Sequence, residues 1–299
     1  MKSVSGLFYF KDKIKKIIDN NICIAPPSFR VDKESFKKNN NIPDIDDKNI
    51  FSIDDIEISY FNDLKKEVNE IKSKLDLESF NSFKKKYTSI PYKKSQLIIK
   101  ANNIKKDNPN FLNNITKFLY DNGIILIVKD KDEKFKYVDG FACFLGGYPI
   151  IVVYKPKLKK DYRRVFFTIA HEIYHLIYRY TENEKDADFF AGAMLLTKED
   201  IFSVLKEFDY DIFKTNDIAD ISIFLKNSDD LKKVIFEKVY KKWNVSMRVI
   251  LKSLINYKFI IGTEMENEYL IDNLKLKLDN NEFNADQINI LSTKEFLHI

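Results

Sequence analysis

The chain contains few of the residues that mark several classes of protein. Among its 299 residues there are only 7 glycines, 7 prolines and 2 cysteines. So little glycine and proline excludes collagen-like chains and disordered chains rich in these two residues. The cysteines, Cys23 and Cys143, are far apart and form no CxxC pair, which favours reduced thiols over a disulfide framework.

An apolar run long enough to cross a membrane is also missing. Spanning a bilayer takes roughly 20 consecutive apolar residues. The N-terminal apolar run at residues 7–10 is too short for the core of a signal peptide. We therefore expect a cytoplasmic protein with no membrane partner.

A strong excess of one charge is absent as well. Lysine and arginine total 50, aspartate and glutamate total 45, and the net charge is +5. This mild excess is not typical of a nucleic-acid-binding protein, so we expect no direct nucleic-acid binding. With 44% apolar and 32% charged residues the chain is globular, and its length favours about two domains at roughly 150 residues each.

Composition and periodicity divide the chain into three expected regions. Residues 1–92 are rich in lysine and asparagine and form an extra N-terminal region of helices and loops, whose role is unknown. Within it an apolar stripe at Leu64, Val68, Ile71 and Leu75 predicts one helix over residues 61–87, after a loop at 39–55. The other two regions are a globular domain at 93–225 and a helical segment at 226–299.

The globular domain is expected to belong to the α+β class, mostly helical with a small antiparallel sheet. Residues 124–129 predict a strand, and two β-rich runs around Gly146-Gly147 predict a hairpin. Tandem helices are expected at 165–180 and 183–196, with the sheet packed on the first of them. Further helices are predicted after Thr197 and Ser246, which are good N-cap residues, and at 95–106, 109–122 and 231–242.

The motif that carries chemistry is HEIYH at residues 171–175. On a helix, His171 and His175 are one turn apart, so both imidazoles can bind one zinc ion. Glu172 can then reach an activated water molecule as a general base. Since the chain has only three histidines, a chance pair at this spacing is improbable.

A catalytic zinc site needs a third protein ligand, and Glu184 is the best candidate. It begins the second tandem helix, on the face marked by Ala187 and Ala191. The alternative is a capping box with Thr181, which fits the S/T-x-x-E pattern. Asp188, one turn after Glu184, is placed to accept the ring N–H of a ligating histidine.

The strings RRVFFTIAHEIYHLIY (163–178) and ENEKDADFFAGAMLL (182–196) resemble the ImmA/IrrE-type zinc metallopeptidases, whose pattern is FTxAHExxH followed by ExxA[ND]xFAxxLLMP. The resemblance covers about residues 95–260. It implies a zincin-like metallopeptidase domain at 93–225, one zinc ion per chain bound by His171, His175 and Glu184, and Glu172 as catalytic base. Thr197 stands at the position of the proline that ends this pattern.

What the resemblance implies about function is a zinc-dependent endopeptidase that cleaves a partner protein, in the family often a DNA-bound repressor. A DNA-binding domain common in relatives is not evident in residues 1–92. The segment at 238–260 resembles the helical segment that follows the family's catalytic region and has a helix-turn-helix look, although packing or substrate docking explains it as well.

Two alternatives remain open at this stage. The same scaffold could act without hydrolysis, as a sensor, an antirepressor or a toxin–antitoxin component. It could also hydrolyse a non-peptide amide. A His2Glu site does not by itself distinguish zinc from manganese or iron. Four side chains are candidate donors to the oxyanion of the reaction: Tyr148, Tyr174, Tyr178 and His298.

Overall fold

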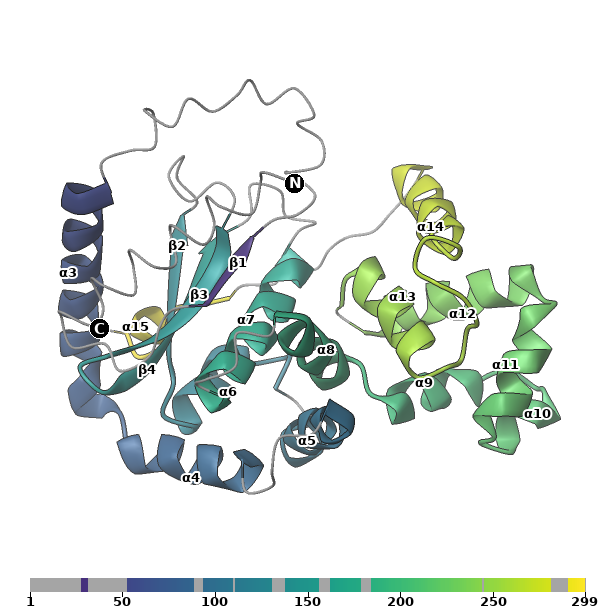
Figure 1. The fold of residues 1–299 in the computed structure, drawn as a ribbon, viewed down its shortest axis with the longest axis horizontal. Helices are drawn as coiled ribbons and strands as arrows, with labels where there is room; N and C mark the ends of the chain where they lie inside the picture. Colours follow the sequence, from purple (N-terminus) through teal and green to yellow (C-terminus); the bar gives the residue numbers. More distant parts are fainter. Residues whose placement is uncertain are drawn as a thin grey trace.

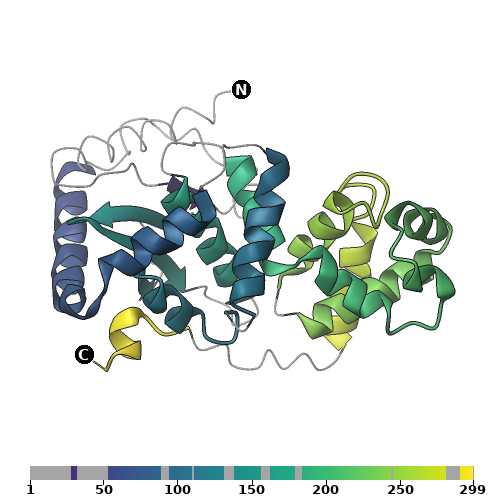
Figure 2. The same cartoon turned by 90° about the horizontal axis from the view of Figure 1, so that it is seen from below.

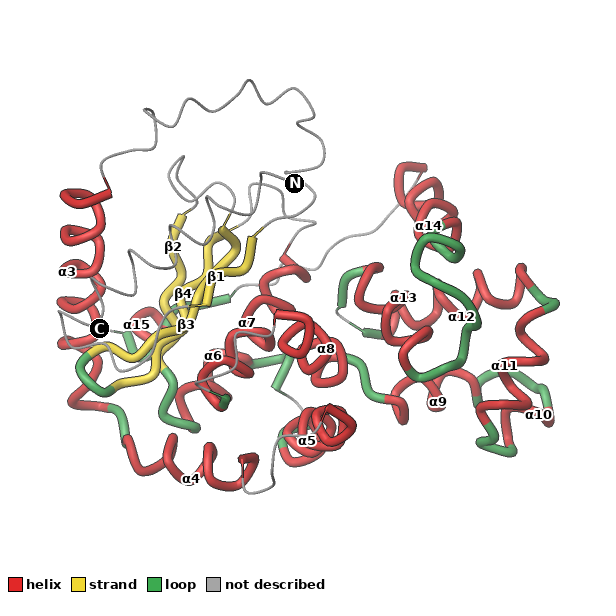
Figure 3. Tube along the Cα trace, in the orientation of Figure 1, coloured by secondary structure: helices red, strands yellow, loops and turns green. Residues whose placement is uncertain are grey.

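A computed structural model of the protein describes residues 28–31, 53–88, 94–109, 111–130, 138–155, 162–178, 184–243, 245–280 and 290–298. It is mostly helical with one small sheet, which confirms the α+β class (Figure 3). Most of the N-terminal region, including residues 39–52 of the expected loop, lies outside the described residues. No helix in the described part of the chain is long and apolar enough to cross a membrane.

The sheet has four strands in the order β1-β3-β4-β2 and is mixed, so the prediction of an antiparallel sheet is wrong. Strands β3 (Val138–Leu145) and β4 (Tyr148–Lys155) form the predicted hairpin, and β1 (Ser28–Val31) extends it antiparallel to β3. Strand β2 (Ile125–Asp130) runs parallel to β4. The apolar runs of β2 and β4 suit strands that are covered on both faces, as parallel strands usually are.

The hairpin turn depends on its two glycines. Gly146 and Gly147 have φ angles of +59° and +87°, a left-handed conformation that other residues adopt only with strain. Two such residues in succession match the right-handed twist of the flanking strands. The structure confirms the predicted hairpin. It also confirms the strand expected at 124–129, which is β2.

The single helix expected over residues 61–87 is in fact two helices. Helix α3 (Ile53–Ile71) begins inside the expected loop, and the short 3-10 turn η2 (Lys72–Lys74) ends it. Leu75 is then extended, and the Asp76 carboxylate accepts from the Glu78 backbone N–H at 3.0 Å, at the start of α4 (Leu77–Thr88). The apolar stripe continued across this break, which is why periodicity alone missed it.

Helix α7 (Tyr162–Ile177) packs on β3 and β4, as expected for the helix that contains HEIYH. Gly140 makes this close approach possible, because a Cβ there would lie 2.7 Å from the Thr168 side chain of α7 and 2.6 Å from the Val152 carbonyl oxygen. Helix α8 (Glu184–Leu195) packs on α7, and α5 (Lys94–Asp107) packs on α8. The sheet therefore sets the position of α7, and α7 sets the position of α8.

A second set of helices, here called the helical group, lies beside the sheet and its helices (Figures 1 and 2). Its first and fifth helices begin at the predicted N-caps, Thr197 and Ser246, whose side chains accept the backbone N–H groups of Asp200 and Val249. The helical group consists of α9 (Lys198–Leu205), α10 (Asp211–Lys214), α11 (Ile218–Lys226), α12 (Asp229–Lys242), α13 (Met247–Asn256) and α14 (Tyr269–Asn280). The domain boundaries expected at residues 92 and 225 stay a prediction.

The end of the described chain returns to the sheet. Helix α15 (Thr293–Phe296) packs against β2, α3 and α6 (Ile115–Asp121), far from the helical group that precedes it (Figure 2). The fully buried Thr293 hydroxyl accepts the backbone N–H of Leu126 at 2.8 Å. Thr116 Oγ1 donates to the Leu291 carbonyl at 2.7 Å, and Lys294 pairs with Glu70 at 2.5 Å. These contacts cover the outer edge of β2.

We expect Thr293→Val to destabilise the protein by about 1–3 kcal/mol, because it leaves the buried Leu126 N–H without its acceptor. Valine fills nearly the same space, so the loss reports the hydrogen bond. Thr215→Val is the matched control: its hydroxyl accepts the Asp217 N–H at an exposed site, and the expected loss is within about 0.5 kcal/mol. Urea unfolding of both variants measures the difference. Equal losses would show that the Thr293 contact does not secure the strand edge.

Candidate metal centre

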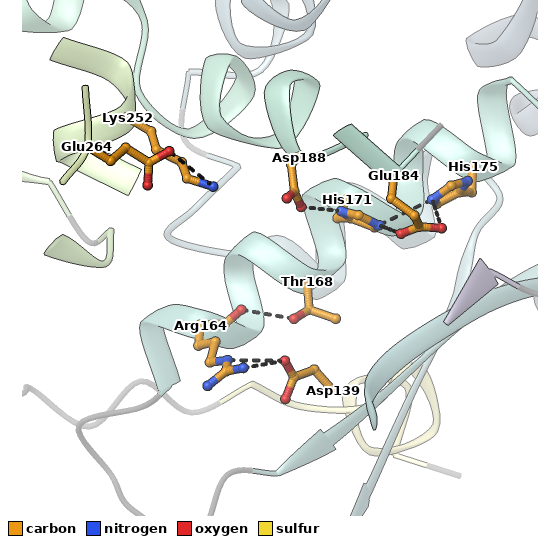
Figure 4. A network of polar contacts seen from close by, with 9 residues as sticks. All are labelled: Asp139, Arg164, Thr168, His171, His175, Glu184, Asp188, Lys252 and Glu264. Atoms are coloured by element: carbon orange, nitrogen blue, oxygen red, sulfur yellow. Dashed lines mark hydrogen bonds and ion pairs between the residues drawn. The ribbon is translucent and has the colours of Figure 1, made fainter. Parts of the chain in front are cut away.

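Helix α7 presents its polar residues along one face. Arg164, Thr168, His171 and His175 recur at the helical period of three or four residues and line this face (Figure 4). Between Val165 and Ile177 the remaining residues are buried, and all of them except Glu172 are apolar. His171 is itself buried, while His175 is partly open. The two imidazoles therefore point together out of an apolar helix.

The chain reverses after α7 and brings Glu184, the first residue of α8, to the two histidines. His171 Nε2 lies 3.2 Å from His175 Nε2 and 3.1 Å from Glu184 Oε2. His175 Nε2 lies 3.8 Å from Glu184 Oε1. Thus the three predicted ligands converge, and the Glu184 carboxylate faces His171. Thr181, the partner in the alternative capping box, lies outside the described residues.

The spacing of these atoms fits a single zinc ion. In a tetrahedral site with ligand bonds of about 2.0–2.1 Å, neighbouring ligand atoms lie about 3.3–3.4 Å apart. The three observed distances, 3.1, 3.2 and 3.8 Å, bracket this value. Two imidazole nitrogens and one carboxylate are a donor set that zinc accepts in catalytic sites. Their role as ligands stays a prediction, and the geometry is compatible with it.

Asp188 supports the first of the two histidines, at the place predicted from its spacing. Its Oδ1 lies 3.0 Å from His171 Nδ1. The Asp188 carboxylate can accept a hydrogen bond from Nδ1, and in the tautomer with the proton on Nδ1 the Nε2 lone pair is free to bind a metal ion on the side of His175 and Glu184. Such a contact fixes the orientation of the ring and makes it a better ligand.

We expect Asp188→Asn to weaken zinc binding by about 10–100-fold while leaving the fold intact. Asparagine keeps the size of the side chain but removes the charge that holds the His171 tautomer. Competition against a zinc chelator measures the affinity. Asp272→Asn, at an exposed position on α14, is the control and should bind zinc as the wild type does. Unchanged affinity in Asp188→Asn would exclude the supporting role.

Glu172 lies on the same helix turn as the proposed ligands and is fully buried. Aromatic rings pack against both histidines of the site. The Phe167 ring centroid lies 6.4 Å from that of His171, and Tyr174 meets His175 edge-on at 5.3 Å. Apolar walls of this kind lower the local dielectric constant and strengthen the electrostatic interactions of the groups inside.

Two of the four candidate oxyanion donors lie away from the metal centre. Tyr148 packs with the apolar cluster on the face of the sheet opposite α7, and His298 follows α15 near β2. Tyr174 and Tyr178 remain beside the site. Burial raises the pKa of Tyr178 to about 12, so its hydroxyl stays protonated at neutral pH, and here it donates to the Tyr87 carbonyl oxygen at 3.5 Å.

The other acid of α8, Asp186, is not in the group of side chains that could hold a metal ion. It is almost completely buried, and this burial raises the pKa of its carboxyl group. Sequence and structure therefore agree on which acids face the histidines.

One polar pair beside the site was missed in the sequence. Arg164 donates from Nε and Nη2 to Asp139 Oδ2 at 3.1 and 2.9 Å, joining the first turns of α7 to the start of β3 (Figure 4). Arg164 lies just before the helix that was expected over residues 165–180. Arg164 lies seven residues before His171, about two helical turns, so both side chains lie on one face of the helix. This spacing could have indicated that Arg164 lies beside the site.

No family model matches this chain, and no curated protein or solved structure is significantly similar to it.

Proposed function

We propose that the protein is a cytoplasmic, zinc-dependent endopeptidase of the ImmA/IrrE type with a zincin-like catalytic domain. The observation that carries the proposal is the convergence of His171, His175 and Glu184 within 3.8 Å, next to the buried Glu172. A cluster that only stabilised the fold would not require three metal-binding side chains, a supporting carboxylate and a buried glutamate within two helices.

His171, His175 and Glu184 would hold the zinc ion in this proposal. When bound, zinc supplies Lewis acidity, which acidifies water and polarises a carbonyl group. Asp188 keeps the His171 ring in the orientation and tautomer that ligation requires. Tyr174 and the surrounding apolar residues exclude bulk water from the back of the site.

Glu172 carries the proton through the reaction. Its carboxylate accepts a proton as the water oxygen attacks the carbonyl carbon of the substrate, and it then donates that proton to the amide nitrogen as the C–N bond breaks. Tyr174 and Tyr178 are the two remaining candidates for stabilising the oxyanion. The products are a free carboxylate and a free amine.

The proposed substrate is a protein, as in the resembling family, where it is often a DNA-bound repressor. Direct nucleic-acid binding by this chain is not part of the proposal. On α13 the two basic side chains that a helix-turn-helix reading would use are in ion pairs, Arg248 with Glu268 at 3.4 Å and Lys252 with Glu264 at 3.8 Å. Their charges are therefore partly neutralised within the protein.

The experiment that tests the proposal is the zinc content of the full chain, purified without added metal and measured by elemental mass spectrometry. We expect about one zinc ion per chain, as three protein ligands imply. A chain that binds no zinc even when zinc is supplied would rule out the peptidase.

A further inference from the structure

A buried ammonium group lies where helix α8 ends and helix α9 begins. It belongs to Lys105 on α5, which is only 7% exposed. Its Nζ donates to the carbonyl oxygen of Leu195, the last residue of α8, at 2.8 Å. The same Nζ forms an ion pair with the Asp200 carboxylate in the first turn of α9. One charge on α5 therefore contacts both helices at their junction.

The chain enters the helical group through two buried residues, Leu196 and Thr197. Tyr257, at the end of α13, donates from its hydroxyl to the Leu196 carbonyl oxygen at 3.1 Å. The Thr197 backbone N–H donates at 2.8 Å to Asp200 Oδ2, the oxygen that Lys105 also contacts. The direction in which α9 leaves α8 is therefore fixed by polar contacts from α5, α9 and α13.

Aromatic rings connect the end of α12 to the same part of the molecule. Lys105 Nζ lies 4.4 Å from the centroid of the Trp243 ring, at the C-terminal end of α12. A second basic residue, Arg163 on the first turn of α7, lies 4.2 Å from the Tyr240 ring on α12. Such cation–π contacts are attractive, and more so where water is excluded. The buried Lys105 thus contacts the helical group at two places, Asp200 and Trp243.

A buried charge is costly, and this cost argues for a specific role. Burial lowers the pKa of Lys105, and the Asp200 carboxylate opposes that change. Apolar residues of similar volume often replace a buried ion pair without loss of stability. In some proteins a buried polar group instead selects one arrangement among several that apolar packing would permit. The junction between α8 and α9 has the features that such a role requires.

The orientation of the helical group matters because α13 lies beside the metal centre. Phe189 of α8 and Ser253 of α13 line the same small cavity. Their neighbours in the sequence are Asp188, which contacts His171, and Lys252. Figure 4 shows Lys252 on the Asp188 side of the two histidines. The angle between α8 and α9 therefore determines which part of the helical group borders the metal centre.

We propose that Lys105 is a conformational lock, whose charge holds the helical group in one orientation against α5 and α8. Without this charge α9 can leave α8 at more than one angle, while the contacts of α13 with α8 and of Arg163 with Tyr240 keep the helical group attached. The lock needs neither zinc nor hydrolysis. Its test is therefore independent of the metal-centre proposal.

The test is the distance between two spin labels on the full chain, measured by pulsed dipolar spectroscopy. The labels are attached at Lys66→Cys on α3 and Asp211→Cys on α10, both exposed positions. Cys23 is replaced by serine, and Cys143 is buried. We expect one narrow distance distribution for the wild-type lock and a broader one, or a second distance, for Lys105→Met. Unchanged distances in Lys105→Met would overturn the proposal.

The matched control is Lys232→Met. Lys232 is also buried, at 8% exposed, and pairs with Asp229 at 2.5 Å, but both residues belong to α12. This variant removes an ion pair of the same kind inside the helical group, so the distance distribution should stay narrow. Equal broadening in Lys232→Met and Lys105→Met would show that any lost pair loosens the protein and would overturn the lock.

A double variant separates orientation from stability. Lys105→Met leaves the Asp200 carboxylate without its counter-charge, which lowers the Tm. Lys105→Met/Asp200→Asn removes that cost, and the amide oxygen can still accept the Thr197 N–H, so this protein should melt above the single variant. We expect its distance distribution to stay broad and its backbone amides at 195–201 to exchange at least about tenfold faster than in the wild type. A narrow distribution with wild-type exchange, or failure of both variants to fold, would assign the pair to stability alone and overturn the lock.

Discussion

Replacing Glu172 by glutamine is expected to lower the rate of peptide hydrolysis by about 10²–10⁴-fold, the usual contribution of a general base. Glutamine has the same shape but cannot accept a proton from water. His171, His175 and Glu184 are untouched, so zinc content should stay at one ion per chain. Cleavage of a library of fluorogenic peptides, measured together with zinc content, checks both expectations.

Loss of folding is not expected to account for a lower rate of hydrolysis by Glu172→Gln. Glu172 is fully buried, and a neutral amide is less costly to bury than a charged carboxylate. The variant should therefore unfold at a temperature equal to or above that of the wild type. Glu199→Gln, at an exposed position on α9, controls for the loss of one negative charge. A Glu172→Gln protein that cleaves peptides at the normal rate would exclude the mechanism.

Replacing His175 by alanine is expected to reduce zinc content from about one ion per chain to nearly none. Only His171 and Glu184 would remain, and catalytic zinc sites use three protein ligands. The loss of affinity should exceed that of Asp188→Asn, which leaves all three ligands in place. Elemental mass spectrometry of the purified variant gives the stoichiometry directly.

The same variant should lose its stabilisation by zinc. Zinc at about 100 times its Kd adds about 2.7 kcal/mol to a protein that binds it only when folded. For a chain of this size that raises the Tm by about 4 °C. His298→Ala is the matched control, because it removes the one histidine outside the motif and should keep both the metal and the shift. A His175→Ala protein that still takes up one zinc ion would refute the ligand assignment.

Local signals in the sequence predicted much of the site. The helical period placed His171 and His175 on one face, and the spacing of Glu184 and Asp188 placed both acids toward them. The two histidines share a face because they are one helical turn apart, and Asp188 is one turn from Glu184, so local spacing indicated these positions; the roles of the residues stay predictions. The N-caps at Thr197 and Ser246 are local in the same way, since one side chain meets the first turn of its own helix.

Long-range pairings were beyond the reach of the sequence. The parallel alignment of β2 with β4 depends on the packing of the whole sheet, and a buried apolar run does not reveal its partner. The break at Asp76 was hidden because the apolar residues kept their period across it. The Arg164–Asp139 pair joins two elements 25 residues apart, so neither residue shows it alone.

The return of α15 to the sheet has a consequence for synthesis on the ribosome. Leu126 and Thr293, whose hydrogen bond covers the edge of β2, are 167 positions apart. At about 5–20 residues per second, the ribosome needs roughly 10–30 s to make the intervening chain, during which the nascent strand edge is uncovered. An uncovered edge can pair with other nascent chains. We therefore expect aggregation during expression to fall when translation of the helical group is faster.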